Sequence, residues 1–232
     1  FDELNVGTTL YPDVSIRRVA NHSYVGTGFL DGSGEYSPSA TSTVLRVGDW
    51  YSEVDEVVQV YAPNNNNTFS STASRVLMAT SFNGLVVGVS DFSHGEKVIP
   101  LDSIYVAGRV AINVVVPTGT TSSAAPIGAS AATLLIAAAQ ENTAWSQSST
   151  VTRSGAIVFN AERIETIKAA LMAGASRQTL NNTSVGDVQG YRALATHRTN
   201  NGLDWRYGAG QINVYNSYSI LAAGEYSSLE DG

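Results

Sequence analysis

Short apolar runs alternate along this chain with stretches of helical periodicity, and this alternation restricts the fold more than any other feature. The runs 57–62 and 85–89 are hydrophobic at nearly every position, as is typical of strands buried on both faces. Helices cover both sides of the parallel sheets that such strands form, so an α/β fold with three layers (αβα) and a mainly parallel sheet is predicted. Strands are expected at 14–20, 57–62, 85–89 and 110–116, and helices at 43–53, 122–140, 160–173 and 211–223.

The composition suits one globular domain. Of the 232 residues, 43% are hydrophobic and only 14% are charged, so the chain can bury a sizeable core. The net charge is −7 and no basic patch stands out, which argues against nucleic acid and anionic membranes as partners. No apolar run reaches the length of a membrane span. We expect residues 1–224 to form the domain and 225–232 to be a polar tail or the start of a linker.

Ser122 lies at the start of the longest predicted helix, shortly after an apolar run. Backbone N–H groups at a helix N-terminus lack acceptors within the helix and carry partial positive charge from its dipole. An oxyanion formed by attack of the serine oxygen would be stabilised there. Pro126 is expected in the first helical turn, where its missing N–H costs no hydrogen bond. A serine before a helix can also be a simple N-cap, so this segment alone leaves both roles open.

Several blocks of the chain resemble those of one enzyme family. Residues 120–126, Thr-Thr-Ser-Ser-Ala-Ala-Pro, and the alanine-rich helix after them resemble the nucleophile block of the subtilisin-like serine peptidases, with Thr120 in place of the family's glycine. Residues 57–64 resemble the strand whose asparagine helps to form the oxyanion hole, with Pro63 where glycine is usual. Further similar blocks follow the family's order, at 20–24, 82–91, 167–175 and 207–213.

The resemblance covers about residues 14–224 and implies a subtilisin-like domain that is truncated in its N-terminal part. It implies that Ser122 is the nucleophile and that Asn64 and the Ser122 amide form the oxyanion hole, with the register among Asn64–Asn67 left open. In the family, the blocks with the catalytic aspartate and histidine precede the strand matched to 20–24. Neither block is found among the first twenty residues.

A serine hydroxyl needs a base to take its proton and a third group to orient that base. Of the three histidines, His22 is expected to be a core residue of a strand, His94 to lie on a loop and His197 to be exposed. None of them can be linked to Asp49 or Asp91 from the sequence. The base and its orienting acid are therefore expected to come from outside this chain.

No cofactor is identifiable from the sequence. The chain has no cysteine and its three histidines are scattered, which argues against a zinc site. Loop carboxylates and carbonyl groups leave a structural calcium ion open. Asn-X-Ser/Thr sequons, for example at Asn21 and Asn66, fit an extracellular or cell-surface location.

Two functions of different classes follow. In the first, the chain is part of a secreted subtilisin-like serine endopeptidase, inactive alone and completed by an N-terminal fragment of the same protein. In the second, it is a non-catalytic subtilase-like scaffold or a self-assembling protein of filaments or surfaces. A subtilisin-like sheet cut before its first strands would expose an edge, and an exposed edge can pair with identical chains.

Overall fold

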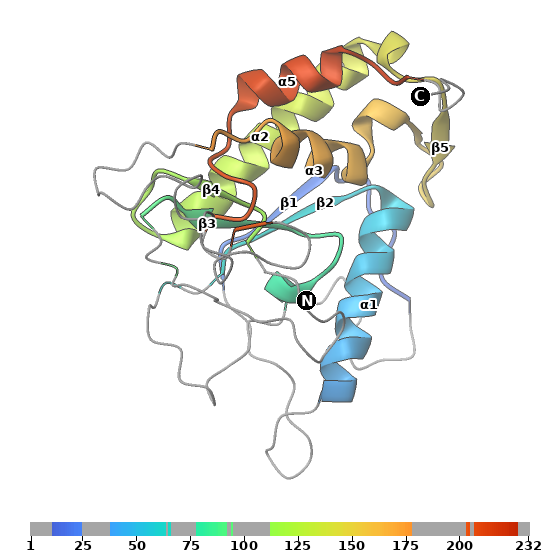
Figure 1. Cartoon of the computed structure of the whole chain (residues 1–232). Helices are drawn as coiled ribbons and strands as arrows, with labels where there is room; N and C mark the ends of the chain where they lie inside the picture. The colour runs from blue at the N-terminus through green and yellow to red at the C-terminus, as the bar shows by residue number, and fades with distance from the viewer. Residues whose placement is uncertain are drawn as a thin grey trace.

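The structure is a computed structural model of the whole chain (Figure 1). It describes residues 11–24, 38–63, 65, 78–91, 94, 112–177, 203–204 and 207–226.

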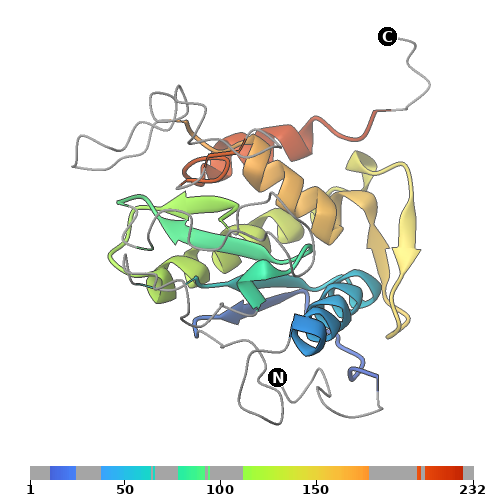
Figure 2. The same cartoon turned by 60° about the horizontal axis from the view of Figure 1, so that its bottom comes forward.

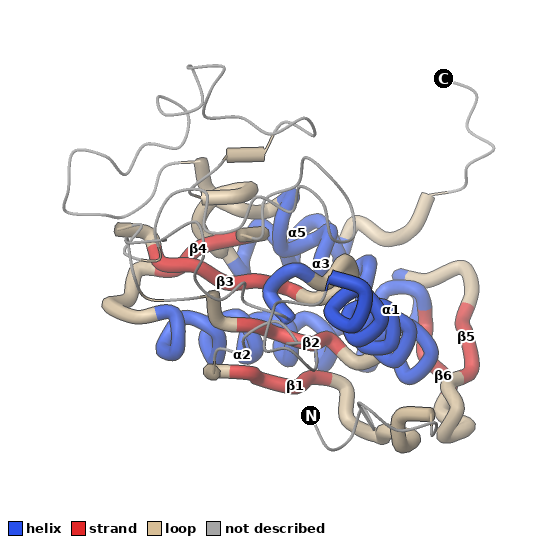
Figure 3. The backbone as a smooth tube through the Cα atoms, turned by 90° about the horizontal axis from the view of Figure 1, so that it is seen from below, coloured by secondary structure: helices blue, strands red, loops and turns tan. Residues whose placement is uncertain are grey.

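The centre of the fold is a parallel four-stranded sheet, as the apolar runs predict. It consists of β1 (Val19–His22), β2 (Val58–Tyr61), β3 (Leu85–Val89) and β4 (Val114–Val116), and the spatial order β1-β2-β3-β4 is also the order in the chain. β2, β3 and β4 are buried along their whole length. β1 is only partly buried and lies at one edge (Figure 3). The α/β class is confirmed.

The first strand begins later than the expected range of 14–20. The N–H of Ser15 donates to the Asp55 carboxylate at 2.9 Å, outside any strand ladder. The Arg18 guanidinium reaches the carbonyl of Glu56, and the carbonyl of Arg18 accepts the first inter-strand hydrogen bond, from Val58. Contacts with distant residues, which the local pattern does not encode, therefore shift the start of β1 to Val19.

The longest helix, α2 (Thr121–Glu141), lies across one face of the sheet and contacts all four strands. Gly128 allows this close approach, because a Cβ at this position would lie 2.5 Å from Val87 Cγ2 on β3. By length and hydropathy α2 could cross a membrane, but its apolar residues pack against the sheet in the core cluster. α1 (Pro38–Asp55) lies on the other face (Figure 2), which completes the three layers.

Two shorter helices, α3 (Ile164–Ala173) and α5 (Val214–Ala222), pack against each other and against α2. The expected helix at 160–173 starts later than predicted, since residues 160–162 form a 3₁₀ turn, η4 (Asn160–Glu162), and Asn160 does not cap α3. α5 starts at Val214 because the Asn213 side chain caps it by accepting from the N–H of Asn216.

A two-stranded antiparallel hairpin lies beside the main sheet and is not predicted from the sequence. It consists of β5 (Ser149–Val151) and β6 (Ile157–Phe159). Two short 3₁₀ turns, η2 (Met78–Thr80) and η3 (Thr143–Trp145), complete the described elements. Arg153, in the loop of the hairpin, ties it to α1 by an ion pair with Asp55 in which Nη2 and Oδ2 are 2.6 Å apart.

Candidate active site

Ser122 lies in the first turn of α2, at the end of the sheet where the parallel strands finish. Thr120 caps the helix, because its hydroxyl accepts from the N–H of Ser123 at 3.2 Å. Ser122 is therefore not the N-cap. Its half-buried hydroxyl donates to the carbonyl of Ser23, directly after β1, at 3.2 Å. The structure thus brings the carboxyl end of the edge strand and the start of α2 together around this serine.

The N–H of Ser122 has no hydrogen-bond acceptor among the described residues, and it belongs to the first helical turn, whose N–H groups have no intrahelical acceptor. The macrodipole of a 21-residue helix adds partial positive charge here. Pro126 lies in the second turn of α2 and not in the first as expected. It lacks the N–H that would bond the Ser122 carbonyl four residues earlier, so the helical hydrogen-bond pattern is incomplete at Ser122.

The segment after β2 is tied to the start of α2 by Asn65. The carboxamide oxygen of Asn65 accepts from the Thr121 N–H at 2.7 Å and from the Thr121 hydroxyl at 2.8 Å. The Thr121 hydroxyl also contacts the carbonyl of Pro63. Asn64, the expected oxyanion-hole residue, lies outside the described residues. Within Asn64–Asn67, the described Asn65 positions the helix start. The run of four asparagines is the only sequence signal for this role.

His22 is engaged by its neighbours in the sheet. Its ring stacks on Tyr61 with centroids 4.8 Å apart, and Nδ1 lies 3.1 Å from the Tyr24 hydroxyl. Nε2 forms a short hydrogen bond with the Gln59 carboxamide. Both ring nitrogens are therefore used within β1, β2 and Tyr24, and neither bonds to Ser122, which agrees with a structural residue.

His94 is fully buried against β3. Its Nδ1 accepts from the N–H of Val89 at 2.9 Å, and Gly88 leaves space for the ring, because a Cβ on Gly88 would lie 2.8 Å from His94 Cε1. The expected loop position is thus a buried turn. His197 lies outside the described residues.

The two aspartates considered with these histidines have other surroundings. Asp49 is buried in α1, where its carboxylate accepts from the N–H groups of Phe82 and Asn83 at 2.9 and 2.7 Å. It therefore holds the segment before β3. Asp91 is exposed in the turn after β3. In the described part of the chain, no group of three or more acidic, histidine or cysteine side chains could hold a metal ion.

A cluster of buried ion pairs lies at the opposite end of the sheet, where β1 and β2 begin. Arg18 pairs with Glu162 at 2.9 Å and Arg163 with Glu56 at 2.9 Å. The second Glu56 oxygen accepts from the N–H of Ile164 at 3.0 Å and so caps α3. Burial raises the pKa of Glu56, although Ile164 and Arg163 act against this. These charges lie far from Ser122 and connect β1, α1, η4 and α3.

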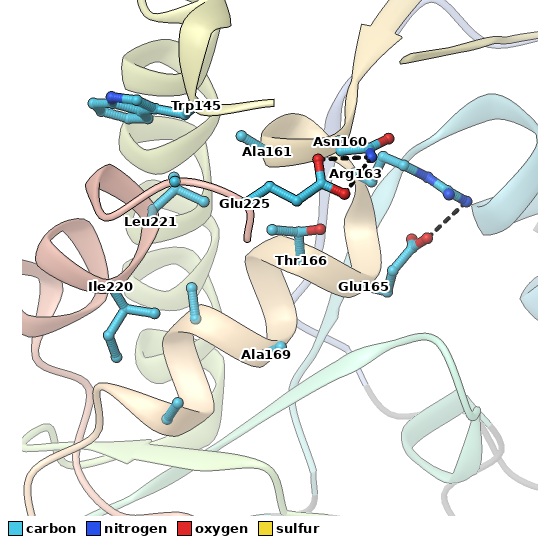
Figure 4. Close-up of a pocket in the computed structure, with 13 residues that line it drawn as sticks. Trp145, Asn160, Ala161, Arg163, Glu165, Thr166, Ala169, Ile220, Leu221 and Glu225 are labelled. Carbon is cyan, nitrogen blue, oxygen red and sulfur yellow. Dashed lines mark hydrogen bonds and ion pairs between the residues drawn. The ribbon is translucent and has the colours of Figure 1, made fainter. Parts of the chain in front are cut away.

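A pocket of about 370 Å³ lies between α3 and α5 (Figure 4). Alanines of α3 form one wall, and Trp145, Leu221 and Glu225 line the other side. Glu225 accepts from Asn160 at 2.9 Å. Trp145 follows the C-terminus of α2, whereas Ser122 is at its N-terminus, and a helix of this length spans roughly 30 Å. The pocket therefore does not belong to the Ser122 site.

Comparison with known proteins finds similar folds but no similar sequence. No family model matches this chain, and no curated protein sequence matches it significantly. Among solved structures, a lanthipeptide protease is similar with a TM-score of 0.54 and 15% identity, over 94% of this chain and 64% of that one. The prenylagaramide maturation protease PagA gives a TM-score of 0.49 and 15% identity, over 88% of this chain and 62% of that one.

The fold is subtilisin-like, as the ordered blocks of the sequence predict. At 15% identity the likeness extends to the fold alone. The chain spans less than two thirds of the length of both proteases.

Proposed function

We propose that this chain is the nucleophile-bearing part of a subtilisin-like serine endopeptidase. The observation that carries the proposal is the position of Ser122. It lies in the first turn of α2, beside the carboxyl end of β1, and its backbone N–H has no hydrogen-bond acceptor among the described residues. The same fold occurs in the lanthipeptide protease, a protein named for proteolysis. A serine at the mouth of a helix that covers a parallel sheet is well placed for acyl transfer.

In the proposed reaction, the Ser122 oxygen attacks a peptide carbonyl and forms a tetrahedral oxyanion. The Ser122 N–H and the positive end of the α2 dipole stabilise this charge, and Asn64 supplies a second donor. Loss of one such donor typically lowers kcat by about 10²–10³. The hydroxyl must leave the Ser23 carbonyl, which accepts a hydrogen bond but is too weak a base to take the proton. No cofactor takes part; a calcium ion would serve only stability.

An imidazole base and a carboxylate that orients it complete the proposed site from outside the described residues. His22 and His94 are engaged elsewhere. A serine with neither partner keeps little of the acceleration of a complete triad, which is non-additive in its members. We therefore propose that the chain alone is inactive, and that the complete enzyme acts on peptides outside the cell or at its surface.

Covalent labelling with a fluorophosphonate probe tests this function. The protein would be prepared with and without the polypeptide encoded directly upstream of Phe1, and labelled serines would be located by mass spectrometry. We expect labelling at Ser122 only when the upstream polypeptide is present. Ser122→Ala should abolish the labelling, and Ser123→Ala, an exposed neighbour in the same turn, should retain it. An unlabelled Ser122 in the combined protein would contradict the proposal.

A non-catalytic scaffold is the second candidate function. The hydrogen bond from the Ser122 hydroxyl to the Ser23 carbonyl supports it, because the hydroxyl is bonded to a group that cannot take its proton. Self-assembly would then use the edge strand β1. Sedimentation velocity of the purified chain over a hundredfold range of concentration tests the scaffold, which should form dimers or filaments. A monomer at every concentration would contradict it.

A further inference from the structure

The pocket of about 370 Å³ between α3 and α5 has an apolar end and a polar end (Figure 4). At the apolar end, Ala169 and Ala173 line it from the second half of α3, where a spacing of four residues places them on one face of the helix. Ile220 of α5, which is 44% exposed, lines it from the other side. The volume lies at the lower end of the range for small-molecule pockets, about 300–1,000 Å³. The apolar end therefore suits an alkyl chain.

The polar end holds the carboxylate of Glu225, just after α5. Both carboxylate oxygens accept from the Asn160 carboxamide at 2.9 Å, and one of them also accepts from the Gln147 N–H at 2.8 Å. Thr166, in the first turn of α3, lines the same pocket. A carboxylate has about four lone-pair sites, so two neutral donors leave room for others. The carboxylate is thus held in position and can still accept hydrogen bonds from a ligand.

No described cation neutralises the Glu225 carboxylate. Arg163 is the only cation among the described lining residues, and its guanidinium pairs with Glu56 at 2.9 Å and with Glu165 at 2.6 Å. Residues 227–232, which follow in the sequence, include two acidic residues and no basic one. The pocket therefore combines an apolar channel with a negative charge that attracts a cation.

We propose that this pocket binds a lysine side chain of a partner polypeptide. The ammonium group pairs with Glu225 and donates to the Thr166 hydroxyl, and the alkyl stem lies along Ala169, Ala173 and Ile220. Lysine suits this lining because it carries a compact charge with three donors at the end of a flexible four-carbon stem. The pocket is larger than one such side chain, so a neighbouring apolar residue of the partner fits beside the alanines.

The lysine site is separate from the serine site. Trp145, which lines the pocket, follows the C-terminus of α2, whereas Ser122 lies in the first turn of that helix. A polypeptide held by its lysine here is therefore bound at a distance from the serine. The inference rests on the shape and charge of the pocket and not on the proposed function, since a scaffold and an endopeptidase could each hold a partner in this way.

Titration of the purified chain with a capped Leu-Lys-Leu tripeptide, followed by NMR, tests the inference. A matched tripeptide with norleucine in place of lysine keeps the alkyl stem and removes the charge. We expect the lysine peptide to shift the amide signals of Ala169, Ala173 and Ile220, and to bind about tenfold or more tightly than the norleucine peptide. Added salt should weaken the binding of the lysine peptide only.

Substitutions in the chain locate the contact. Glu225→Gln keeps the side-chain shape and should weaken the lysine peptide about tenfold or more. Glu141→Gln removes the same charge from an exposed residue at the end of α2, outside the described lining, and should leave the affinity unchanged. Ala169→Phe fills the apolar end from an exposed position and should also weaken the lysine peptide, which keeps the test valid if Glu225→Gln loosens the end of α5.

Several results would overturn the inference. These are the absence of amide shifts, shifts confined to the surroundings of Ser122, equal affinities of the lysine and norleucine peptides, or equal losses in Glu225→Gln and Glu141→Gln. n-Butylamine that binds as tightly as the lysine peptide would show that the site takes a free alkylammonium ion, against a polypeptide partner. Glu225→Gln should leave fluorophosphonate labelling of Ser122 unchanged, so the two proposals can fail separately.

Discussion

The two ends of the sheet are held together by different forces. At the carboxyl end, around Ser122, the described contacts are neutral hydrogen bonds, such as those from Thr121 to Asn65. At the amino end, arginines reach buried carboxylates: Asp55, Glu56 and Glu162. Buried ion pairs fix the relative position of the elements they join, because separating the two charges costs free energy. Neutral hydrogen bonds can exchange partners more easily. All the described ion pairs therefore lie away from the serine.

The largest expected effect is at the amino end. Asp55→Ala leaves the Arg153 guanidinium and the Ser15 N–H without their carboxylate. Breaking a buried pair from one side costs about 3–5 kcal/mol, and we expect a loss of that size in the free energy of unfolding, measured in urea. Glu165→Ala is the control, because this half-exposed partner of Arg163 should cost below about 1 kcal/mol. Equal losses for the two variants would show that burial does not set the difference.

The second-largest loss of stability is expected at the contact between α2 and β3. Gly128→Val places methyl groups where even a Cβ would lie 2.5 Å from Val87. Overpacking of this kind costs about 1–3 kcal/mol. Ala137→Val, at an exposed position of the same helix, introduces the same side chain without the clash. Helix propensity favours Gly128→Val over this control, because valine is a better helix former than glycine but a poorer one than alanine. Urea unfolding should show the larger loss for Gly128→Val; a loss no greater than that of Ala137→Val would mean that α2 can move away from the sheet freely.

A smaller effect is expected at the carboxyl end. Thr121→Val keeps the side-chain shape but removes the hydroxyl that donates to Asn65. A lost neutral hydrogen bond of this kind costs about 1 kcal/mol in unfolding free energy. Thr133→Val removes a hydroxyl that bonds the helix's own Ala129 carbonyl, and it should cost less. If the two losses are the same, the tie between the β2 segment and α2 contributes nothing of its own.

The smallest expected effect is a pH dependence of the free energy of unfolding that arises from Glu56 at the amino end. Burial raises the pKa of Glu56 above its ordinary value of 4.5, so the folded protein binds this proton more tightly than the unfolded chain. The resulting stabilisation is complete below pH 4.5 and is lost as the pH rises through the folded-state pKa. Urea unfolding between pH 4 and 8 should show this decline in the wild type and not in Glu56→Gln. Parallel pH profiles for both proteins would contradict the raised pKa.

The local sequence predicts elements well where packing follows the apolar pattern. The runs at β2 and β3 and the small-residue helix at α2 are of this kind, and the structure confirms all three. Prediction fails where a distant side chain decides the boundary. α3 starts at Ile164 because Glu56, more than a hundred residues earlier, caps it, so the local signal at Asn160 is overridden.

The β5–β6 hairpin was missed for a related reason. Its three-residue strands are partly exposed and give a weak apolar signal, while Arg153 holds them from outside. At the site, the position of Ser122 at the start of a helix was predictable from composition and spacing. The link from Asn65 to Thr121 was not, because four consecutive asparagines give no register. The catalytic role of Ser122 stays a prediction.

The agreement between strand order and chain order also bears on biosynthesis. β2, β3 and β4 each find a neighbouring strand already synthesised, so pairing can proceed from β1 to β4 as the ribosome delivers the chain. At about 5–20 residues per second, roughly 5–20 s separate the first strand from the last. During that time the face that α2 will cover is open to water. Nascent chains of this protein should therefore bind chaperones that recognise apolar surface until the Ser122 helix has been translated.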